Sequence, residues 1–300
     1  MNTVTVEALR AWSCDGLKWL SKRPGQVISA VAVAVLVTAR IRLASVRRER
    51  RKRWAKIGKD IVVLHGFPRG RYTPNASPFV MKLETYLRLA KITYVFDDTE
   101  PIGPKGQGPW ITLNGEEIAD SQLIIEALGR KFDKNFTSRL PKEQQAIALA
   151  MNLMMTEHIT WGLRIWRYVI DKGEQLRKCS RYDLVSELAV YLWFPRIAKK
   201  RAWAQGIGRH SEKEVEEMMR QDFAALSDYL GDKPFLMGDN PCEVDCTLFG
   251  YISQVLWNYN GSPYGKMVKE DYPNLEAHHS RMKTLLYPDW DALSSLAVKE

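Results

Sequence analysis

The sequence predicts an α/β half followed by an all-α half, both behind a basic N-terminal segment. Three observations lead to this fold class. Residues 60–135 contain short strand patterns separated by turn residues and by two helical patterns. Residues 140–290 contain a succession of apolar patterns at helical spacing. Residues 1–59 combine one short apolar stretch with dense arginine and lysine. We therefore expect three parts with these bounds.

The positive charge of the chain is confined to its N-terminal part. Residues 1–60 hold 14 Lys and Arg against 4 Asp and Glu, whereas the rest of the chain holds 30 against 31. A neutral body does not indicate a nucleic-acid partner. The 4 cysteines and 5 histidines approach no zinc-ligand spacing and no disulfide framework. We expect a reducing compartment and no metal site.

The apolar stretch of the N-terminal segment runs from Val27 to Ala39. As a helix it spans roughly 20 Å, against about 30 Å for the hydrocarbon core of a bilayer, so alone it is too short to cross. The longer stretch 24–46 suffices if Arg40 and Arg42 extend to the headgroups. We predict a signal-anchor at about 24–46, because the basic cluster after it, 47–53, favours the cytosolic side and binds anionic lipid.

This prediction makes membrane lipid a partner and places the body in the cytosol, at an endomembrane or at the outer mitochondrial membrane. Three alternatives remain open for the segment: a mitochondrial-type targeting segment, a cleaved secretory signal and a disordered basic tail. The secretory signal is disfavoured because the apolar stretch ends directly in Arg40-Ile41-Arg42, without small residues for cleavage.

The α/β half has a defined order of expected elements. A serine before a proline is a strong helix start, and Asn-Gly between two strand patterns is a strong hairpin turn. The elements are a strand at 61–65, a helix from Ser77-Pro78, a strand at 92–96, a strand at 110–113, a turn at Asn114-Gly115, a strand from Glu117 and a helix capped by Ser121. This order is typical of a thioredoxin-like domain whose middle helix is shortened or lost.

The all-α half begins with a long helical pattern from Pro141 to about Val169, and a second covers 182–198. Ser211 and Glu214 have capping-box spacing, which predicts a helix from Glu212 to Leu230. A similar box, with Cys242 as the cap and Asp245 at the third helical position, predicts another helix, and a last one spans 272–290. A reactive thiol at Cys242 is conceivable at a helix terminus, but capping or packing explains it better.

Four segments carry a resemblance to a known family: LHGFPR, SPFVMKLETYLRLA, GPWITLNGEEIADSQLIIEAL and GIGRHSEKEVEEMM. They resemble the failed axon connections family, a metaxin-related branch of the glutathione S-transferase superfamily, over roughly residues 60–290. The resemblance implies a thioredoxin-like N-terminal domain and a helical C-terminal domain. Fold alone does not determine activity.

The resemblance also implies a glutathione site. Ser77, which opens the first helix, matches the residue that stabilises the glutathione thiolate, and it is the candidate catalytic residue. Pro109 matches the family's cis-proline, and Gly108 before it offers its backbone to the cysteinyl moiety. Asp120 and Ser121 match the pair that holds the γ-glutamyl group. Each also has a structural interpretation, as a helix cap for the serines and Asp120 and as part of the fold for Pro109.

Two departures from the family pattern limit the chemistry. Ser77 and Val80 stand where a glutaredoxin has cysteines, so thiol–disulfide exchange of that type is excluded. The short connector between Phe96 and Pro109 removes the helix that usually contacts the glycine end of glutathione. Arg69 and Arg71 are candidates to replace those contacts, but ordinary solvated loop cations are the better interpretation of both.

Two functions remain open. The first is a membrane-tethered binding or interaction protein that also binds glutathione; the resemblance implies axonal development or organelle organisation. The alternative is an active glutathione S-transferase in which Ser77 activates the thiol for conjugation or detoxification. Glutathione is a candidate ligand in both cases, and only the alternative function requires it.

Overall fold

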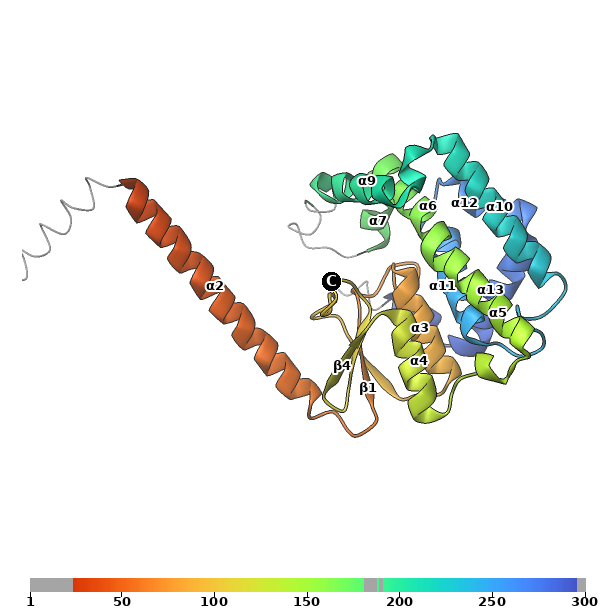
Figure 1. Cartoon of the computed structure of the whole chain (residues 1–300), viewed down its shortest axis with the longest axis horizontal. Coiled ribbons are helices and arrows are strands. Elements are labelled where there is room, and N and C mark those ends of the chain that lie inside the picture. Colours follow the sequence, from red (N-terminus) through yellow and green to blue (C-terminus); the bar gives the residue numbers. More distant parts are fainter. Residues whose placement is uncertain (1–23, 181–187, 189–190, 296–300) are drawn as a thin grey trace, which may run out of the picture. The chain divides into compact units, whose positions relative to one another are not determined.

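The computed structural model describes residues 24–180, 188 and 191–295 (Figure 1). The chain divides between Ile57 and Gly58 into an N-terminal unit and a compact body. In the N-terminal unit, helix α2 runs from Pro24 to Trp54 and has basic residues in its last turn, which the negative end of a helix favours. Among the described helices, none combines the length and the apolarity needed to cross a bilayer.

The body begins with one four-stranded sheet, as expected for a thioredoxin-like domain. Its strands are β1 (Val62–His65), β2 (Tyr94–Asp97), β3 (Trp110–Leu113) and β4 (Glu116–Ala119). The spatial order is β2-β1-β3-β4, with β1 and β2 parallel and the other pairs antiparallel. The predicted hairpin turn is confirmed: Asn114 and Gly115 both have positive φ, as the tight turn between β3 and β4 requires.

Two helices accompany the sheet, α3 (Pro78–Leu89) and α4 (Ser121–Phe132). Figure 1 shows them side by side next to the strands. Ser77 caps α3 as predicted, with proline at the first helical position. Asp120, rather than Ser121, caps α4, and its side chain accepts hydrogen bonds from two backbone N–H groups. Ser121 is the first residue of that helix, so the predicted cap is shifted by one residue.

The rest of the body is helical, as predicted. The order of its elements is η1 (Thr137–Arg139), α5 (Lys142–Leu153), the π-helical η2 (Met154–Ile159), α6 (Thr160–Ile165), the π-helical η3 (Trp166–Ile170), α7 (Glu174–Cys179), α9 (Phe194–Gln205), η4 (Ile207–Arg209), α10 (Glu212–Leu230), α11 (Glu243–Trp257), α12 (Pro263–Lys266), the π-helical η5 (Met267–Asp271), α13 (Pro273–Leu286) and α14 (Trp290–Ser295).

Three of the predicted helices differ from the observed helices in extent or in geometry. The run from Pro141 to Val169 is helical throughout, but two π-helical segments interrupt its α-helical geometry. Of the predicted helix at 182–198, residues 182–187 and 189–190 lie outside the described residues, and α9 begins at Phe194. The predicted last helix is interrupted at Tyr287, because the residue before a proline disfavours helical backbone angles.

Both predicted capping boxes are present. In the second, Asp245 accepts the backbone N–H of Cys242 at 2.9 Å and that of Leu236 at 2.8 Å, and it bonds His278 Nε2 at 2.9 Å. The Cys242 thiol is buried, and burial beside Asp245 raises its pKa. Cys242 is therefore a structural cap, and the reactive-thiol alternative is wrong.

The two halves of the body share one interior, because α3 packs along α11. Phe249 of α11 belongs to the same apolar cluster as Leu83 of α3 and Ile111 of β3. Gly250 lies where the two helices approach most closely: a Cβ there would come within 2.6 Å of the Pro78 carbonyl oxygen. Glycine thus allows α11 to reach the backbone of α3 just after Ser77, and α11 supports that end of α3 directly.

Candidate functional site

The strand register gathers the predicted site residues at one edge of the sheet. Trp110 of β3 pairs with His65 at the carboxyl end of β1 and with Ala119 at the carboxyl end of β4. The loop after β1, the Gly108-Pro109 dipeptide before β3 and the Asp120-Ser121 pair after β4 therefore meet at this edge. The Gly108-Pro109 peptide bond is cis, as the resemblance implied. Helices α3 and α4 both begin here, so two positive helix ends face the same region.

The hydroxyl hydrogen of Ser77 is available for a hydrogen bond to a ligand. Its Oγ accepts the backbone N–H of Val80 at 3.4 Å, and its own N–H donates to Asn75 Oδ1 at 3.0 Å. Among the described residues no acceptor takes the hydroxyl hydrogen. The hydroxyl can therefore donate to an anion at the N-terminus of α3, which is what stabilising a thiolate requires.

Side chains from the helical half hold the loop that precedes Ser77. Arg167 Nη1 donates to the Ala76 carbonyl at 2.9 Å, and Gln254 Nε2 donates to the Asn75 carbonyl at 3.0 Å. Asn258 Nδ2 donates to Thr73 Oγ1 at 2.8 Å. These hydrogen bonds fix the position of the loop and therefore the position of Ser77.

The sequence analysis missed these three anchoring residues. The available signal was weak: Gln254 and Asn258 are polar, four residues apart and adjacent to a run of buried apolar positions in α11. Arg167 lies in the π-helical segment η3, whose irregular geometry has no evident sequence signature. All three are buried, which is unusual for such polar groups unless they are hydrogen-bonded.

A cavity of ≈ 460 Å³ opens beside Ser77 and Gly108. The β1–α3 loop and the connector form one wall, and the helical half supplies α6, η3, α7 and α9 to the other. The second wall carries the aromatic side chains Trp161, Tyr168 and Phe194. Three arginines, Arg164, Arg167 and Arg201, line the same wall. Aromatic rings and cations opposite a hydroxyl at a helix N-terminus suit an apolar molecule that meets a polar, anionic reactant.

Asp120 and Ser121 do not line this cavity but lie at the same sheet edge. The backbone of Asp120 has φ +88°, which is rare outside glycine, and its side chain is exposed. One carboxylate oxygen, Oδ1, accepts the N–H groups of Gln122 and Leu123 at 2.9 and 3.1 Å. The other oxygen has no partner among the described residues, so it can accept from an amine of a ligand.

The connector between β2 and β3 contains no helix in the described residues, as predicted. It folds back so tightly that a Cβ on Gly108 would come within 2.4 Å of the Pro101 carbonyl oxygen. Glycine is therefore required at position 108 for packing.

The interpretation of Arg69 as a solvated loop cation is wrong. Its Nη1 and Nη2 atoms donate to the two carboxylate oxygens of the fully buried Glu84 at 2.6 and 2.8 Å. Its guanidinium also lies 3.8 Å from the centre of the Phe96 ring. Arg69 is thus committed to the interior, and it cannot replace the missing contacts to the glycine end of glutathione. Arg71 is exposed, in agreement with the solvated interpretation.

Lys82 is a fully buried cation behind this sheet edge. Its ammonium donates to Gln122 Oε1 of α4 and to Asn152 Oδ1 of α5, both at 2.9 Å. No carboxylate among the described residues forms an ion pair with it. Burial disfavours the charged form and lowers the pKa of Lys82 to about 8, although the charge of Asp120 acts in the opposite direction.

This lowered pKa predicts a pH-dependent stability. Between pH 8 and 10.5 the unfolded chain keeps the Lys82 proton that the folded chain has lost, so the contribution of Lys82 to the free energy of unfolding rises with pH. We expect this contribution to rise by about 2 kcal/mol between pH 8 and pH 10. The buried cysteine thiols, whose pKa burial raises, act in the opposite direction, so the effect is measured as a difference. In urea unfolding across this range, the free energies of unfolding of the wild type and of the exposed control Lys213→Met should each rise by this amount relative to that of Lys82→Met. Parallel curves for all three proteins would exclude this role of Lys82.

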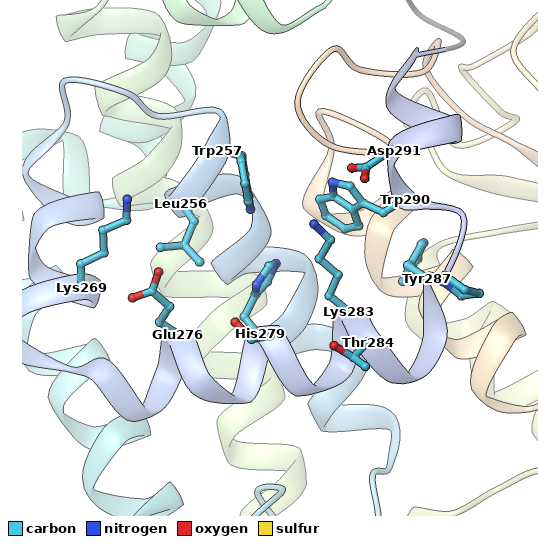
Figure 2. A pocket seen from close by; sticks show the side chains of 12 residues that line it. Leu256, Trp257, Lys269, Glu276, His279, Lys283, Thr284, Tyr287, Trp290 and Asp291 are labelled. Carbon is cyan, nitrogen blue, oxygen red and sulfur yellow. The ribbon is translucent and has the colours of Figure 1, made fainter.

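A second cavity, also of ≈ 460 Å³, lies between the end of α11 and helices η5, α13 and α14. Figure 2 shows Lys283 rising between Trp257 and Trp290. Its Nζ atom lies 5.3 and 4.7 Å from the centres of those two rings. Burial lowers the pKa of His279 to about 3, so this histidine is neutral. None of the predicted site residues lies here. The ammonium group of Lys283 already occupies the space between the Trp257 and Trp290 rings.

Comparisons with known proteins agree with this fold. Two family models match, the glutathione S-transferase N-terminal domain over residues 78–173 and the glutathione S-transferase C-terminal domain over residues 219–282. Among solved structures, a glutathione S-transferase of Ceriporiopsis subvermispora in complex with glutathione has a TM-score of 0.53 at 18% identity, covering 76% of this chain and 99% of that one. This likeness supports the fold.

The chain also resembles curated proteins. It is 36% identical over 251 residues to failed axon connections of Drosophila melanogaster, a match that covers 78% of this chain and 60% of the fly protein. It is 31% identical over 206 residues to an isoprene-epoxide glutathione S-transferase of Rhodococcus, covering 65% and 87%. A metaxin-2 homolog of Caenorhabditis elegans is 25% identical over 187 residues, covering 57% and 77%. The chain therefore belongs to the glutathione S-transferase superfamily and is related within it to failed axon connections and the metaxins.

Proposed function

We propose that this protein binds glutathione at the sheet edge where α3 and α4 begin. The observation that carries the proposal is that two helix N-termini, the hydroxyl hydrogen of Ser77 and the backbone of Gly108 meet at one place. Glutathione is an anion with a thiol, and each of its charged ends requires a partner of opposite polarity.

In this proposal the γ-glutamyl end of glutathione lies at α4. Its amine meets the open carboxylate oxygen of Asp120, and its carboxylate meets the N–H and hydroxyl groups of Ser121 at the start of the helix. The cysteinyl backbone lies along Gly108, and the sulfur points to Ser77 beside the cavity. No cationic side chain is assigned to the glycine end, because Arg69 is paired with Glu84.

Transfer of glutathione to an apolar electrophile is a second candidate function, favoured by the cavity beside Ser77. The thiolate sulfur would form a bond to an electrophilic carbon; with an epoxide, a carbon–oxygen bond breaks and the oxygen takes a proton from water. The named activity of the Rhodococcus relative supports an epoxide as the first electrophile to try. Binding without turnover would instead favour an interaction protein in axonal development or organelle organisation.

Titration calorimetry of the full chain with glutathione tests the proposal. Asp120→Asn keeps the helix cap but removes the charge, so we expect about tenfold or greater loss of affinity. The matched control, Asp133→Asn at the other end of α4, should bind like the wild type. We expect Ser77→Ala to keep the affinity but to raise the pKa of the bound thiol and to lower any conjugation rate. If wild type and Asp120→Asn bind equally, the γ-glutamyl assignment is wrong, and absence of binding refutes the whole proposal.

The N-terminal segment carries a separate proposal. We propose that its basic end, in the last turns of α2, associates with anionic lipid and thereby tethers the body to a membrane from the cytosolic side. The support is the dense positive charge of residues 47–53. A body on the lumenal side would be glycosylated at Asn135 or Asn260, whereas the third sequon asparagine, Asn75, is fully buried. A glycosidase-sensitive mobility shift of the native protein would therefore contradict this topology.

A further inference from the structure

Helix α9 and the residues just before it expose an unusual number of aromatic side chains. Trp193 is 67% exposed and Trp203 is 57% exposed, and Tyr191, Phe194 and Ile197 are exposed as well. Large exposed rings clustered on one short segment mark an interaction site more often than a solvated surface. We call this region the α9 surface; it consists of Tyr191, Trp193, Phe194, Arg196, Ile197, Lys199, Lys200, Arg201 and Trp203.

Cations are interspersed among these rings. Arg196, Lys199, Lys200 and Arg201 are all exposed, and none forms an ion pair with a residue that the structure describes. From Leu188 to Ser211 the chain contains no aspartate or glutamate. The body is otherwise close to neutral, so this concentration of positive charge is local to the α9 surface.

We propose that the α9 surface docks on an anionic lipid bilayer. Tryptophan and tyrosine favour the membrane–water interface, where the ring is apolar and its N–H or O–H is wet. Lysine and arginine beside them are attracted to acidic headgroups. An acidic protein partner would also attract the cations, but exposed tryptophan and tyrosine rings beside lysine and arginine are typical of segments at the bilayer interface.

The inner side of α9 explains how the surface stays exposed. Ala202 is buried and Ala198 half-buried, so small side chains let the helix lie close to the body, while Trp193 and Trp203 remain exposed. Phe194, Ile197 and Arg201 also line the cavity beside Ser77. Docking would therefore bring one wall of that cavity to the bilayer, and apolar molecules dissolved in lipid would reach it directly. The proposal depends neither on glutathione binding nor on the N-terminal segment.

An environment-sensitive fluorophore on the full chain tests the docking. The label is placed at Ile197→Cys in a Cys14→Ser background, because the described cysteines Cys179, Cys242 and Cys246 are buried. On phosphatidylcholine vesicles that contain phosphatidylserine, we expect a blue-shifted, brighter signal that is lost at high salt. The same label at Leu149→Cys, an exposed apolar position on α5, should not respond. A label at Ile197 that stays silent while the chain co-sediments with the vesicles overturns the proposal.

Charge reversal distinguishes lipid binding by the α9 surface from lipid binding by the basic N-terminal segment. Lys199→Glu/Lys200→Glu should raise the lipid concentration that gives a half-maximal response of the Ile197 label by about tenfold or more. This effect is expected even where the N-terminal segment still recruits the chain to the vesicles. The control Lys142→Glu/Lys213→Glu reverses the same charge at two exposed positions near helix N-termini and should leave the response unchanged. Equal responses of the two variants would contradict docking. A label response that grows with protein concentration in the absence of vesicles would identify a second copy as the occupant and refute the lipid assignment.

Discussion

Replacing Arg69 with methionine is expected to lower the free energy of unfolding of the body by about 3 kcal/mol. The substitution leaves Glu84, which is fully buried, without its two closest charged hydrogen bonds. Tyr94 at 2.8 Å and Arg88 at 3.7 Å remain beside the carboxylate and keep the loss near the lower end of the range for broken buried pairs. Because methionine retains apolar contact with Phe96, the substitution measures the loss of the charged group rather than the loss of packing.

Urea denaturation measures this effect against a control in the same loop. Arg71→Met removes an exposed arginine two positions further on and should change the free energy of unfolding by less than about 0.5 kcal/mol. The double variant Arg69→Met/Glu84→Gln removes both charges and should be more stable than the sum of the two single losses implies. Equal losses for Arg69→Met and Arg71→Met would show that the buried pair contributes little.

Gly250→Ala is expected to be the most disruptive alanine substitution at the contact between the two halves, with a loss of about 3 kcal/mol. The new methyl group would lie 2.6 Å from the Pro78 carbonyl oxygen and 3.1 Å from the Lys82 amide nitrogen. Both atoms belong to the backbone of α3 and cannot move without shifting the helix. Because Pro78 directly follows Ser77, the same shift should weaken glutathione binding.

Gly162→Ala is the matched control for this prediction. It is the same substitution in a buried helix, but the new methyl group would lie 2.2 Å from the Met219 sulfur, in a flexible side chain. The better helix propensity of alanine offsets part of the repacking cost. Urea unfolding should therefore show a clearly smaller loss for Gly162→Ala. A loss at position 250 that does not exceed the loss at position 162 would contradict the close α3–α11 contact.

Local patterns were sufficient for most of the secondary structure. The start of α3 at Ser77-Pro78, the Asn114-Gly115 turn and the box of Ser211 and Glu214 depend on atoms within three residues of one another, so the sequence alone predicts them. The resemblance added which of these positions are candidates for a glutathione site. The order of the elements along the chain predicted a thioredoxin-like layout, and the observed four-stranded sheet agrees with it.

The tertiary structure alone decided which polar side chains hold the site in place. Arg167 donates to the carbonyl of Ala76, 91 positions earlier in the chain, and Asn258 reaches Thr73 across 185 positions. No periodicity encodes such partners, because they depend on how α11 and η3 pack against the loop before Ser77. Arg69 shows the same limit: whether a loop cation is solvated or paired with a buried carboxylate is determined by burial, which a local sequence pattern does not contain.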